Sequence, residues 1–146
     1  MLEGLEMICV IVKRQKFELE VWRKKRLPPS RWEKIATAPI AIGAKGYATP
    51  PGFYPVMARA KNPDWLMPHS DWVPKELQGT IVKGNDPRNP IKAAFIKLTE
   101  DGVGIHGTDD LNSLGTKASH GCIRVRPQFA EWLRKRIRKK EPVVII

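Results

Sequence analysis

The residues most capable of chemistry lie between positions 104 and 124, which hold two of the three histidines and one of the two cysteines. His106 ends a short apolar segment, and the tetrapeptide Ser119-His120-Gly121-Cys122 follows after a loop of small and polar residues. A thiol becomes an effective nucleophile when a neighbouring imidazole accepts its proton and stabilises the thiolate. The pattern therefore predicts a nucleophile and base pair made of Cys122 and His106.

Gly121, directly before the candidate nucleophile, is the second feature of this segment. Glycine lets the backbone turn sharply and lets a substrate carbonyl approach the main chain closely. Successive backbone N–H groups at Gly121 and Cys122 would then point at the oxygen that becomes negatively charged during acyl transfer. We expect an oxyanion hole at these two amides.

Other interpretations of the same residues are open. A buried cysteine is often a small apolar residue, and a histidine at the end of a strand is often a hydrogen-bonded polar group. A zinc site is the chemical competitor, with ligands drawn from His106, His120, Cys122 and Asp109 or Asp110. The segment lacks paired C-x-x-C knuckles and an H-E-x-x-H helix, so the pattern predicts no metal and no cofactor. A serine triad from Ser119 and His120 is disfavoured, because neighbours along a strand or tight loop point apart.

Two predicted hairpins supply the framework that must position these groups. Residues 7–12 are apolar and β-branched, whereas residues 17–21 alternate apolar and acidic positions, and both patterns indicate strands. Residues 93–98 and 103–106 indicate a second pair of strands joined by a turn at 100–102. The last of these strands delivers His106 to the rim of its sheet.

Most of the remaining chain is predicted to be strand and loop. Residues 32–38 and 143–146 indicate further strands. The stretch 39–90 is dense in Pro and Gly, which excludes long helices. One helix is predicted from Gln128 to about Lys139, where apolar residues recur at helical spacing. We therefore expect a mainly-β single domain that covers residues 1–146.

The composition fits one globular domain with an anionic partner or anionic surroundings. The chain has 146 residues, of which 42% are hydrophobic and 28% charged, and its net charge is +11. Such an excess is typical of proteins that meet nucleic acid, phospholipid or an acidic wall polymer. No apolar run approaches about 18 residues, which excludes a transmembrane helix. Cys9 and Cys122 are too few for a disulfide framework. Residues 1–6 lack the basic and apolar regions of a secretory signal peptide.

Several further features are weaker candidates. Six of the seven residues from Arg134 to Lys140 are basic, which indicates either a solvated helix face or attraction to an anionic wall polymer. His69 is expected in a surface loop. Trp65 and Trp72 are expected in the core or along a substrate groove.

At the residues that can do chemistry, the chain resembles the catalytic domain of the L,D-transpeptidases, the cysteine enzymes that cross-link bacterial peptidoglycan. Their signature is a His, a spacer, then Ser or Thr, His, Gly, Cys, an apolar residue and Arg or Asn. The matching residues are His106, Ser119, His120, Gly121, Cys122, Ile123 and Arg124. Ile42-Gly43, the stretch 48–54 and Asn89-Pro90 match further family elements, whereas Ile91-Lys92 departs from the frequent Leu-Gly. The resemblance covers nearly the whole chain. It implies a mainly-β, sandwich-like or barrel-like domain with one helix near the C-terminal end.

The resemblance implies the chemistry of the central pair. Cys122 would attack the carbonyl of a donor stem tetrapeptide at the bond before its terminal D-Ala and form a thioester. His106 would accept the thiol proton while the backbone carbonyl of Gly107 holds its ring. An amine of a second stem would then resolve the thioester.

The resemblance also implies supporting residues and partners. The amides of Gly121 and Cys122, with His120, would hold the oxyanion, while Ser119 and Arg124 would bind substrate. Peptidoglycan stem peptides would be the substrates and carbapenem-type β-lactams covalent inhibitors, with no cofactor, no nucleic acid and a location in the cell wall or periplasm.

Two rival functions stay open on the sequence. Water in place of the amine would make the protein an L,D-carboxypeptidase with the same site. A basic module for nucleic acid or another anionic polymer, built on the predicted helix at Arg134 to Lys140, belongs to a different class.

Overall fold

The chain opens with the antiparallel hairpin that its apolar alternation predicts. In the computed structural model, which describes residues 6–146, β1 (Glu6–Lys13) pairs with β2 (Glu18–Lys25) around a short 3-10 turn, η2 (Arg14–Lys16). The expectation that residues 1–6 form no secretory signal peptide concerns residues that, except for Glu6, lie outside the described range. β3 (Trp32–Pro39) continues the sheet on the far side of β2.

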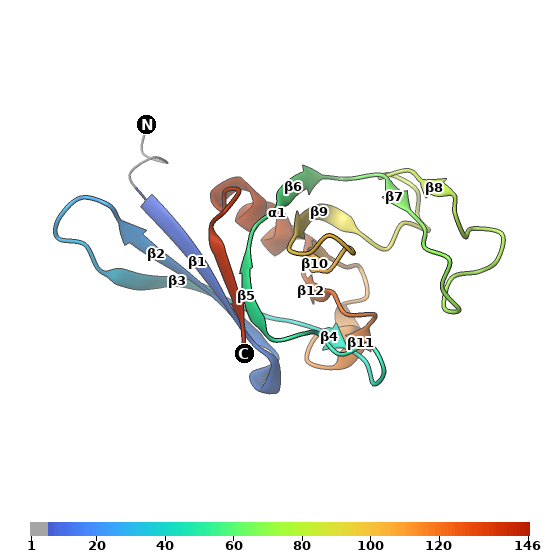
Figure 1. Cartoon of the computed structure of the whole chain (residues 1–146), viewed down its shortest axis with the longest axis horizontal. Coiled ribbons are helices and arrows are strands. Elements are labelled where there is room, and N and C mark those ends of the chain that lie inside the picture. Colours follow the sequence, from blue (N-terminus) through green and yellow to red (C-terminus); the bar gives the residue numbers. More distant parts are fainter. Residues whose placement is uncertain (1–5) are drawn as a thin grey trace.

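The C-terminal strand completes this first sheet. β13 (Pro142–Ile145) pairs in parallel with β1, and β5 (Gly52–Pro55) pairs with β13, so the order is β3-β2-β1-β13-β5. Figure 1 shows this sheet on the left, with the β2–β3 hairpin extending away from the rest of the molecule. The two ends of the chain therefore meet in one sheet.

A second sheet holds the strands that carry the candidate histidine and cysteine. Its order is β12 (Ile123–Val125), β10 (Gly104–Gly107), β9 (Lys92–Lys97) and β6 (Ala58–Lys61). The hairpin of β9 and β10 is the predicted second pair, and β12 runs parallel to β10. A two-stranded ladder, β4 (Ile42–Gly43) with β11 (Lys117–Ser119), adjoins them, and the 3-10 turn η3 (Leu111–Ser113) precedes β11.

One helix, α1 (Pro127–Arg136), packs on β9 and β10. Proline at the first helical position costs no hydrogen bond, because that N–H has no partner inside a helix. Apolar side chains of both sheets and of α1 form one buried cluster that includes Val10, Leu19, Ile96 and Leu133. The expectation of a mainly-β fold with one late helix is confirmed.

The helix ends three residues before the predicted boundary at Lys139. Ile137 is extended, with ψ 139°, although its amide still donates to the carbonyl of Leu133. The side chain of Glu141 accepts from the amide of Arg138 at 2.8 Å and from the amide of Ile8 at 2.6 Å. These bonds draw the chain out of the helix and into β13. Three of the six basic residues between Arg134 and Lys140, namely Arg138, Lys139 and Lys140, therefore lie beyond the end of α1.

The second half of the Pro-rich and Gly-rich stretch, residues 62–90, forms a separate layer at the right of Figure 1, with a short ladder of β7 (Trp65–Leu66) and β8 (Ile81–Val82). It has a small apolar cluster of its own, centred on Met67, Val73 and Val82. The buried amide of Asn89 closes the segment, since its Nδ2 donates to the carbonyls of Pro63 and Lys83 at 3.0 and 3.1 Å. Among residues 6–146, no helix has the length and apolar character needed to span a bilayer.

Candidate active site

The signature residues converge on one cavity of about 330 Å³. Its walls come from the second sheet, the turn after β9 and the β7–β8 layer. His106, Ser119, His120, Cys122 and Arg124 all line it. Trp65 and Trp72 of the β7–β8 layer also line it, together with Tyr47, Pro68, Ser70, Pro90, Ile91, Asp101, Gly102 and Val103. The fold thus brings together residues that are far apart in sequence.

Cys122 lies in the turn between β11 and β12, where its side chain is partly buried. Its Sγ is 3.4 Å from the carbonyl oxygen of Gly102, to which the thiol can donate. Burial raises the pKa of the Cys122 thiol, while a backbone hydrogen bond from Gly104 and the charge of Arg124 act in the opposite direction. Cys122 at rest is therefore a protonated thiol.

The turn that holds Cys122 is built by the hydroxyl of Ser119. This buried hydroxyl donates to the carbonyl of Cys122 at 2.5 Å and accepts from the amide of Gly121 at 3.2 Å. Gly121 has φ +118°, a backbone conformation that other residues rarely adopt. Ser119 lines the cavity, but its hydroxyl already donates one hydrogen bond and accepts another within the turn.

Thr49 fixes the same turn from outside, and the sequence analysis assigned it no role. Its hydroxyl is buried, accepts from the amide of Gly43 at 2.9 Å and donates to the carbonyl of Gly121 at 2.8 Å. Thr49 therefore ties β4 to the loop of the candidate nucleophile. The only signal in the sequence was its place in the stretch 48–54 that matches the family.

His106 reaches the cavity from β10 and is almost fully buried, with 6% of its surface exposed. Its Nδ1 lies 2.7 Å from the carbonyl oxygen of Gly107, so Nδ1 holds the proton and Nε2 is left as the basic nitrogen. Gly107 occupies a bulge between β9 and β10, where a Cβ atom would collide with the carbonyl oxygen of Lys92. Glycine is thus required at the residue that orients the imidazole.

The pKa of His106 is lowered to about 4, mainly by burial, while the hydrogen bond to Gly107 opposes the shift and the charge of Arg124 adds to it. The imidazole is consequently neutral near pH 7. The imidazole of His106 and the thiol of Cys122 are therefore both neutral near pH 7.

His120 and Arg124 form the rim of the cavity. The ring of His120 stacks on Trp72, with 3.9 Å between ring centroids and 8° between planes, and meets the edge of Tyr47 at 4.8 Å. Burial and the charge of Arg124 lower the pKa of His120. The guanidinium of Arg124 is 3.7 Å from the carboxylate of Asp110, while its backbone pairs with Ala41.

The remaining candidates are placed elsewhere. His69 is exposed and does not line the cavity. Cys9 lies in β1, and burial raises the pKa of its thiol. Both cysteines are free. Within the described range 6–146, no three His, Cys, Asp or Glu side chains cluster as metal ligands would.

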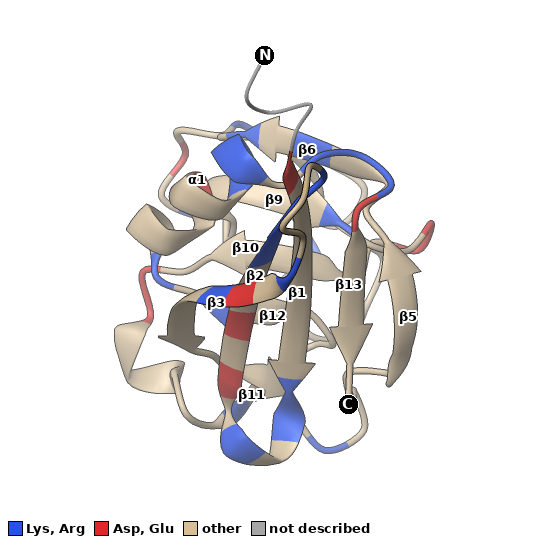
Figure 2. Ribbon diagram, turned by 90° about the vertical axis from the view of Figure 1, so that its left-hand side faces the viewer, with Lys and Arg blue, Asp and Glu red and all other residues tan. Residues whose placement is uncertain are grey.

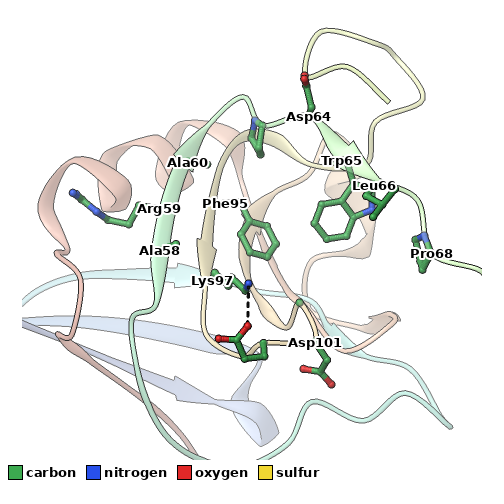
Figure 3. Close-up of a pocket in the computed structure, with 13 residues that line it drawn as sticks. Ala58, Arg59, Ala60, Asp64, Trp65, Leu66, Pro68, Phe95, Lys97 and Asp101 are labelled. Atoms are coloured by element: carbon green, nitrogen blue, oxygen red, sulfur yellow. Dashed lines mark ion pairs between the residues drawn. The ribbon is translucent and has the colours of Figure 1, made fainter. Parts of the chain in front are cut away.

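A second cavity, of about 480 Å³, adjoins the first and shares four wall residues with it, namely Trp65, Pro68, Asp101 and Gly102. Figure 3 shows Phe95 and Trp65 side by side in its wall, and their ring centroids are 5.6 Å apart. Lys97, at the lower edge in this view, forms an ion pair with Glu100 at 3.8 Å. The two cavities therefore adjoin at these four residues.

Comparison with known proteins agrees with the geometry. The family model described as YkuD, L,D-transpeptidase catalytic domain, matches residues 7–145. Two Bacillus proteins named as putative L,D-transpeptidases are similar to this chain over 91 residues. YqjB of Bacillus subtilis is 31% identical, and the match covers 59% of this chain and 45% of YqjB. YkuD of Bacillus licheniformis is 29% identical, and the match covers 62% of this chain and 41% of YkuD. The matched region spans less than half the length of these relatives.

Solved structures share the fold at low sequence identity. An L,D-transpeptidase from Mycobacterium smegmatis superposes with a TM-score of 0.73 at 19% identity, over 97% of this chain and 59% of its own. L,D-transpeptidase 3 from Mycobacterium tuberculosis, solved with a faropenem-derived adduct, gives 0.71 at 20% identity, over 96% and 60%. At these identities the likeness concerns the fold.

Proposed function

The chain belongs to the family of L,D-transpeptidase catalytic domains, and from this premise we propose that it is a cysteine acyltransferase acting on peptidoglycan stem peptides. The observation that carries the proposal is the shared cavity of Cys122 and His106, in which the imidazole has its Nδ1 proton bound to Gly107. Its Nε2 is thereby a base with no proton of its own, as removal of a thiol proton requires.

The reaction proceeds in two balanced halves. Cys122 Sγ bonds to the carbonyl carbon of the donor's third residue as its proton passes to His106 Nε2. The bond from that carbon to the nitrogen of the terminal D-Ala breaks, and the proton on His106 leaves with this amine. A thioester remains. The amine of a second stem then attacks the same carbon, gives its proton to His106, and the thiol of Cys122 is restored.

The oxyanion of each half is assigned to backbone amides beside the nucleophile. The amide of Gly121 already donates to Ser119. Within residues 6–146, the amides of His120 and Cys122 make no hydrogen bond to another group. We therefore assign the developing negative charge to these two amides. Ser119 then acts as a positioning residue for the turn. Arg124, which lies 3.7 Å from the carboxylate of Asp110, would exchange this pair for a carboxylate of the substrate.

The adjoining cavity favours transfer to an amine over hydrolysis. Its wall is shared with the cavity of Cys122, and it is large enough for part of a second peptide. A peptide seated there would bring an amine toward the thioester and displace water. A peptidoglycan substrate also favours a location in the cell wall or periplasm.

The test combines substrate turnover with covalent trapping. The protein is incubated with a purified tetrapeptide stem, with and without a second stem as amine acceptor, and products are identified by mass. We expect a cross-linked dimer and free D-Ala. A carbapenem is expected to leave one adduct per chain on the peptide that contains Cys122.

Two variants of the proposed pair and two matched controls make the result specific. Cys122→Ala and His106→Ala are each expected to reduce turnover by at least about a thousandfold. Cys9→Ser and His69→Ala, which alter residues outside the cavity, are expected to keep it. Release of D-Ala without cross-linking would favour the L,D-carboxypeptidase. An adduct on Cys9, or turnover that persists in Cys122→Ala, contradicts the proposed mechanism.

A further inference from the structure

The tip of the β2–β3 hairpin is an exposed basic segment that the proposed reaction does not use. All residues from Lys25 to Lys34 are exposed. The tip includes Lys24, Lys25, Arg26 and Arg31, with no acidic residue before Glu33. In Figure 2, where the hairpin comes toward the viewer, blue segments mark this tip.

The turn after α1 brings more positive charge to the same face. Arg26 of the hairpin lines a surface hollow together with Arg138, Lys139 and Lys140. The basic run found in the sequence therefore does not form one helix face. Its second half joins the hairpin tip, and the two form one basic surface, which we define as Lys24, Lys25, Arg26, Arg31, Lys139 and Lys140.

The nearby carboxylates are committed to other bases. Glu33 pairs with Arg23 at 2.6 Å, and Glu141 pairs with Arg138 at 3.6 Å. Within the part of the chain that the structure describes, no carboxylate lies within 4.0 Å of a charged nitrogen of the basic surface. Its charge therefore remains available to an anionic partner.

Two large apolar side chains stand among these bases. Leu27 is 60% exposed at the hairpin tip, and Trp32 is 41% exposed, with the ammonium of Lys24 5.8 Å above its ring. A purely ionic polymer gives no reason to expose a leucine there. A lipid headgroup layer does, because it combines negative charge with an apolar interior in which leucine and tryptophan are stable.

We propose that the β2–β3 hairpin tip and the turn after α1 bind the surface of a bilayer that contains anionic lipids. Leu27 and Trp32 enter the headgroup layer, and the basic surface meets the lipid phosphates. The inference does not depend on the proposed reaction. In Figure 1 the hairpin tip lies at the far left, whereas β11 and β12, between which Cys122 lies, are drawn right of the first sheet, so the cavity stays accessible on a domain bound through the tip.

The test is co-sedimentation of the full chain with vesicles of two compositions. One contains equal parts of phosphatidylglycerol and phosphatidylcholine, and the other phosphatidylcholine alone. We expect binding to the anionic vesicles to be at least about tenfold tighter and to weaken as salt is added. Equal binding to both vesicles, or no binding to either, overturns the proposal.

Variants separate the ionic from the apolar contribution. Lys25→Glu/Arg26→Glu is expected to weaken binding by more than about tenfold, and Leu27→Ser/Trp32→Ser by about tenfold. Lys75→Glu/Lys83→Glu makes the same charge change in the β7–β8 layer and is expected to bind as the wild type does. If Leu27→Ser/Trp32→Ser binds anionic vesicles as tightly as the wild type does, and soluble polyphosphate competes fully with this binding, the surface binds an anionic polymer. This result would refute binding to a bilayer.

Activity on a soluble stem peptide keeps this test apart from that of the reaction. The hairpin variants alter exposed residues remote from Cys122, so they are expected to retain turnover while losing vesicle binding. A variant that loses both functions and unfolds at the same denaturant concentration as the wild type contradicts the separation of the two surfaces.

Discussion

Replacing Thr49 by valine is expected to destabilise the domain and to slow acylation of Cys122. Valine has nearly the shape of threonine, so the side-chain volume in this buried position hardly changes. The substitution removes the hydroxyl that accepts from the amide of Gly43 and donates to the carbonyl of Gly121. Both backbone groups then stay buried without a partner.

The magnitude follows from those two groups. Each buried donor or acceptor left without a partner costs about 1–3 kcal/mol. Gly43 and Gly121 are both buried, so the loss in free energy of unfolding is expected to be about 3 kcal/mol. Because Gly121 adjoins the nucleophile, the turn also loses its tie to β4. Acylation is expected to slow about tenfold or more.

The assay pairs urea unfolding with the rate of carbapenem adduct formation on Cys122. Thr49→Ser is the matched control, since it keeps the hydroxyl and removes one buried methyl group. It is expected to lose about 1 kcal/mol and to acylate at nearly the wild-type rate. The contrast between the two variants isolates the hydroxyl.

Two results would refute this reasoning. If Thr49→Val unfolds within about 0.5 kcal/mol of the wild type, the hydrogen bonds do not stabilise the turn. If Thr49→Ser loses as much stability and rate as Thr49→Val, the loss cannot be assigned to the hydroxyl, because serine keeps it.

The other two predictions concern pH and the β7–β8 layer. Because the pKa of His106 lies at about 4, the acylation rate is expected to stay constant as the pH falls through 6.5 and to decrease as it passes through about 4. An inflection of the rate near pH 6.5 would contradict a buried neutral imidazole. The folded pKa is below the unfolded value, so protonation also lowers stability between pH 6.5 and about 4, and circular dichroism must accompany the rate profile. Asn89→Asp removes the side-chain N–H groups that donate to the carbonyls of Pro63 and Lys83. The substitution is expected to raise the hydrogen-exchange rate of the backbone amides in residues 62–90 by at least about tenfold. An unchanged rate would show that the Asn89 side chain does not stabilise the β7–β8 layer.

Much of the framework was predictable because its signals are local. Period-two patterns and β-branched runs predicted the hairpins at 7–21 and 93–106, and helical spacing predicted the helix that begins at Pro127. The helix boundary was wrong because the side chain of Glu141, which follows the helix, takes the amide of Arg138. A pattern that reads only neighbouring residues cannot include that competition.

The sequence by itself indicated the family and predicted Cys122 and His106 as the reactive pair, because the spacing from His106 to Cys122 and the residues between Ser119 and Arg124 form a specific signature. Only the tertiary structure determined the protonation states of these groups and the long-range contacts that hold them. Burial keeps the imidazole and the thiol neutral near pH 7, although backbone hydrogen bonds at Gly107 and Gly104 act in the opposite direction. Thr49 and Gly121 meet across 72 positions of the chain, and the basic run divides between a helix and a hairpin face. Desolvation and long-range hydrogen bonds depend on which distant segments pack together, and no local pattern encodes that.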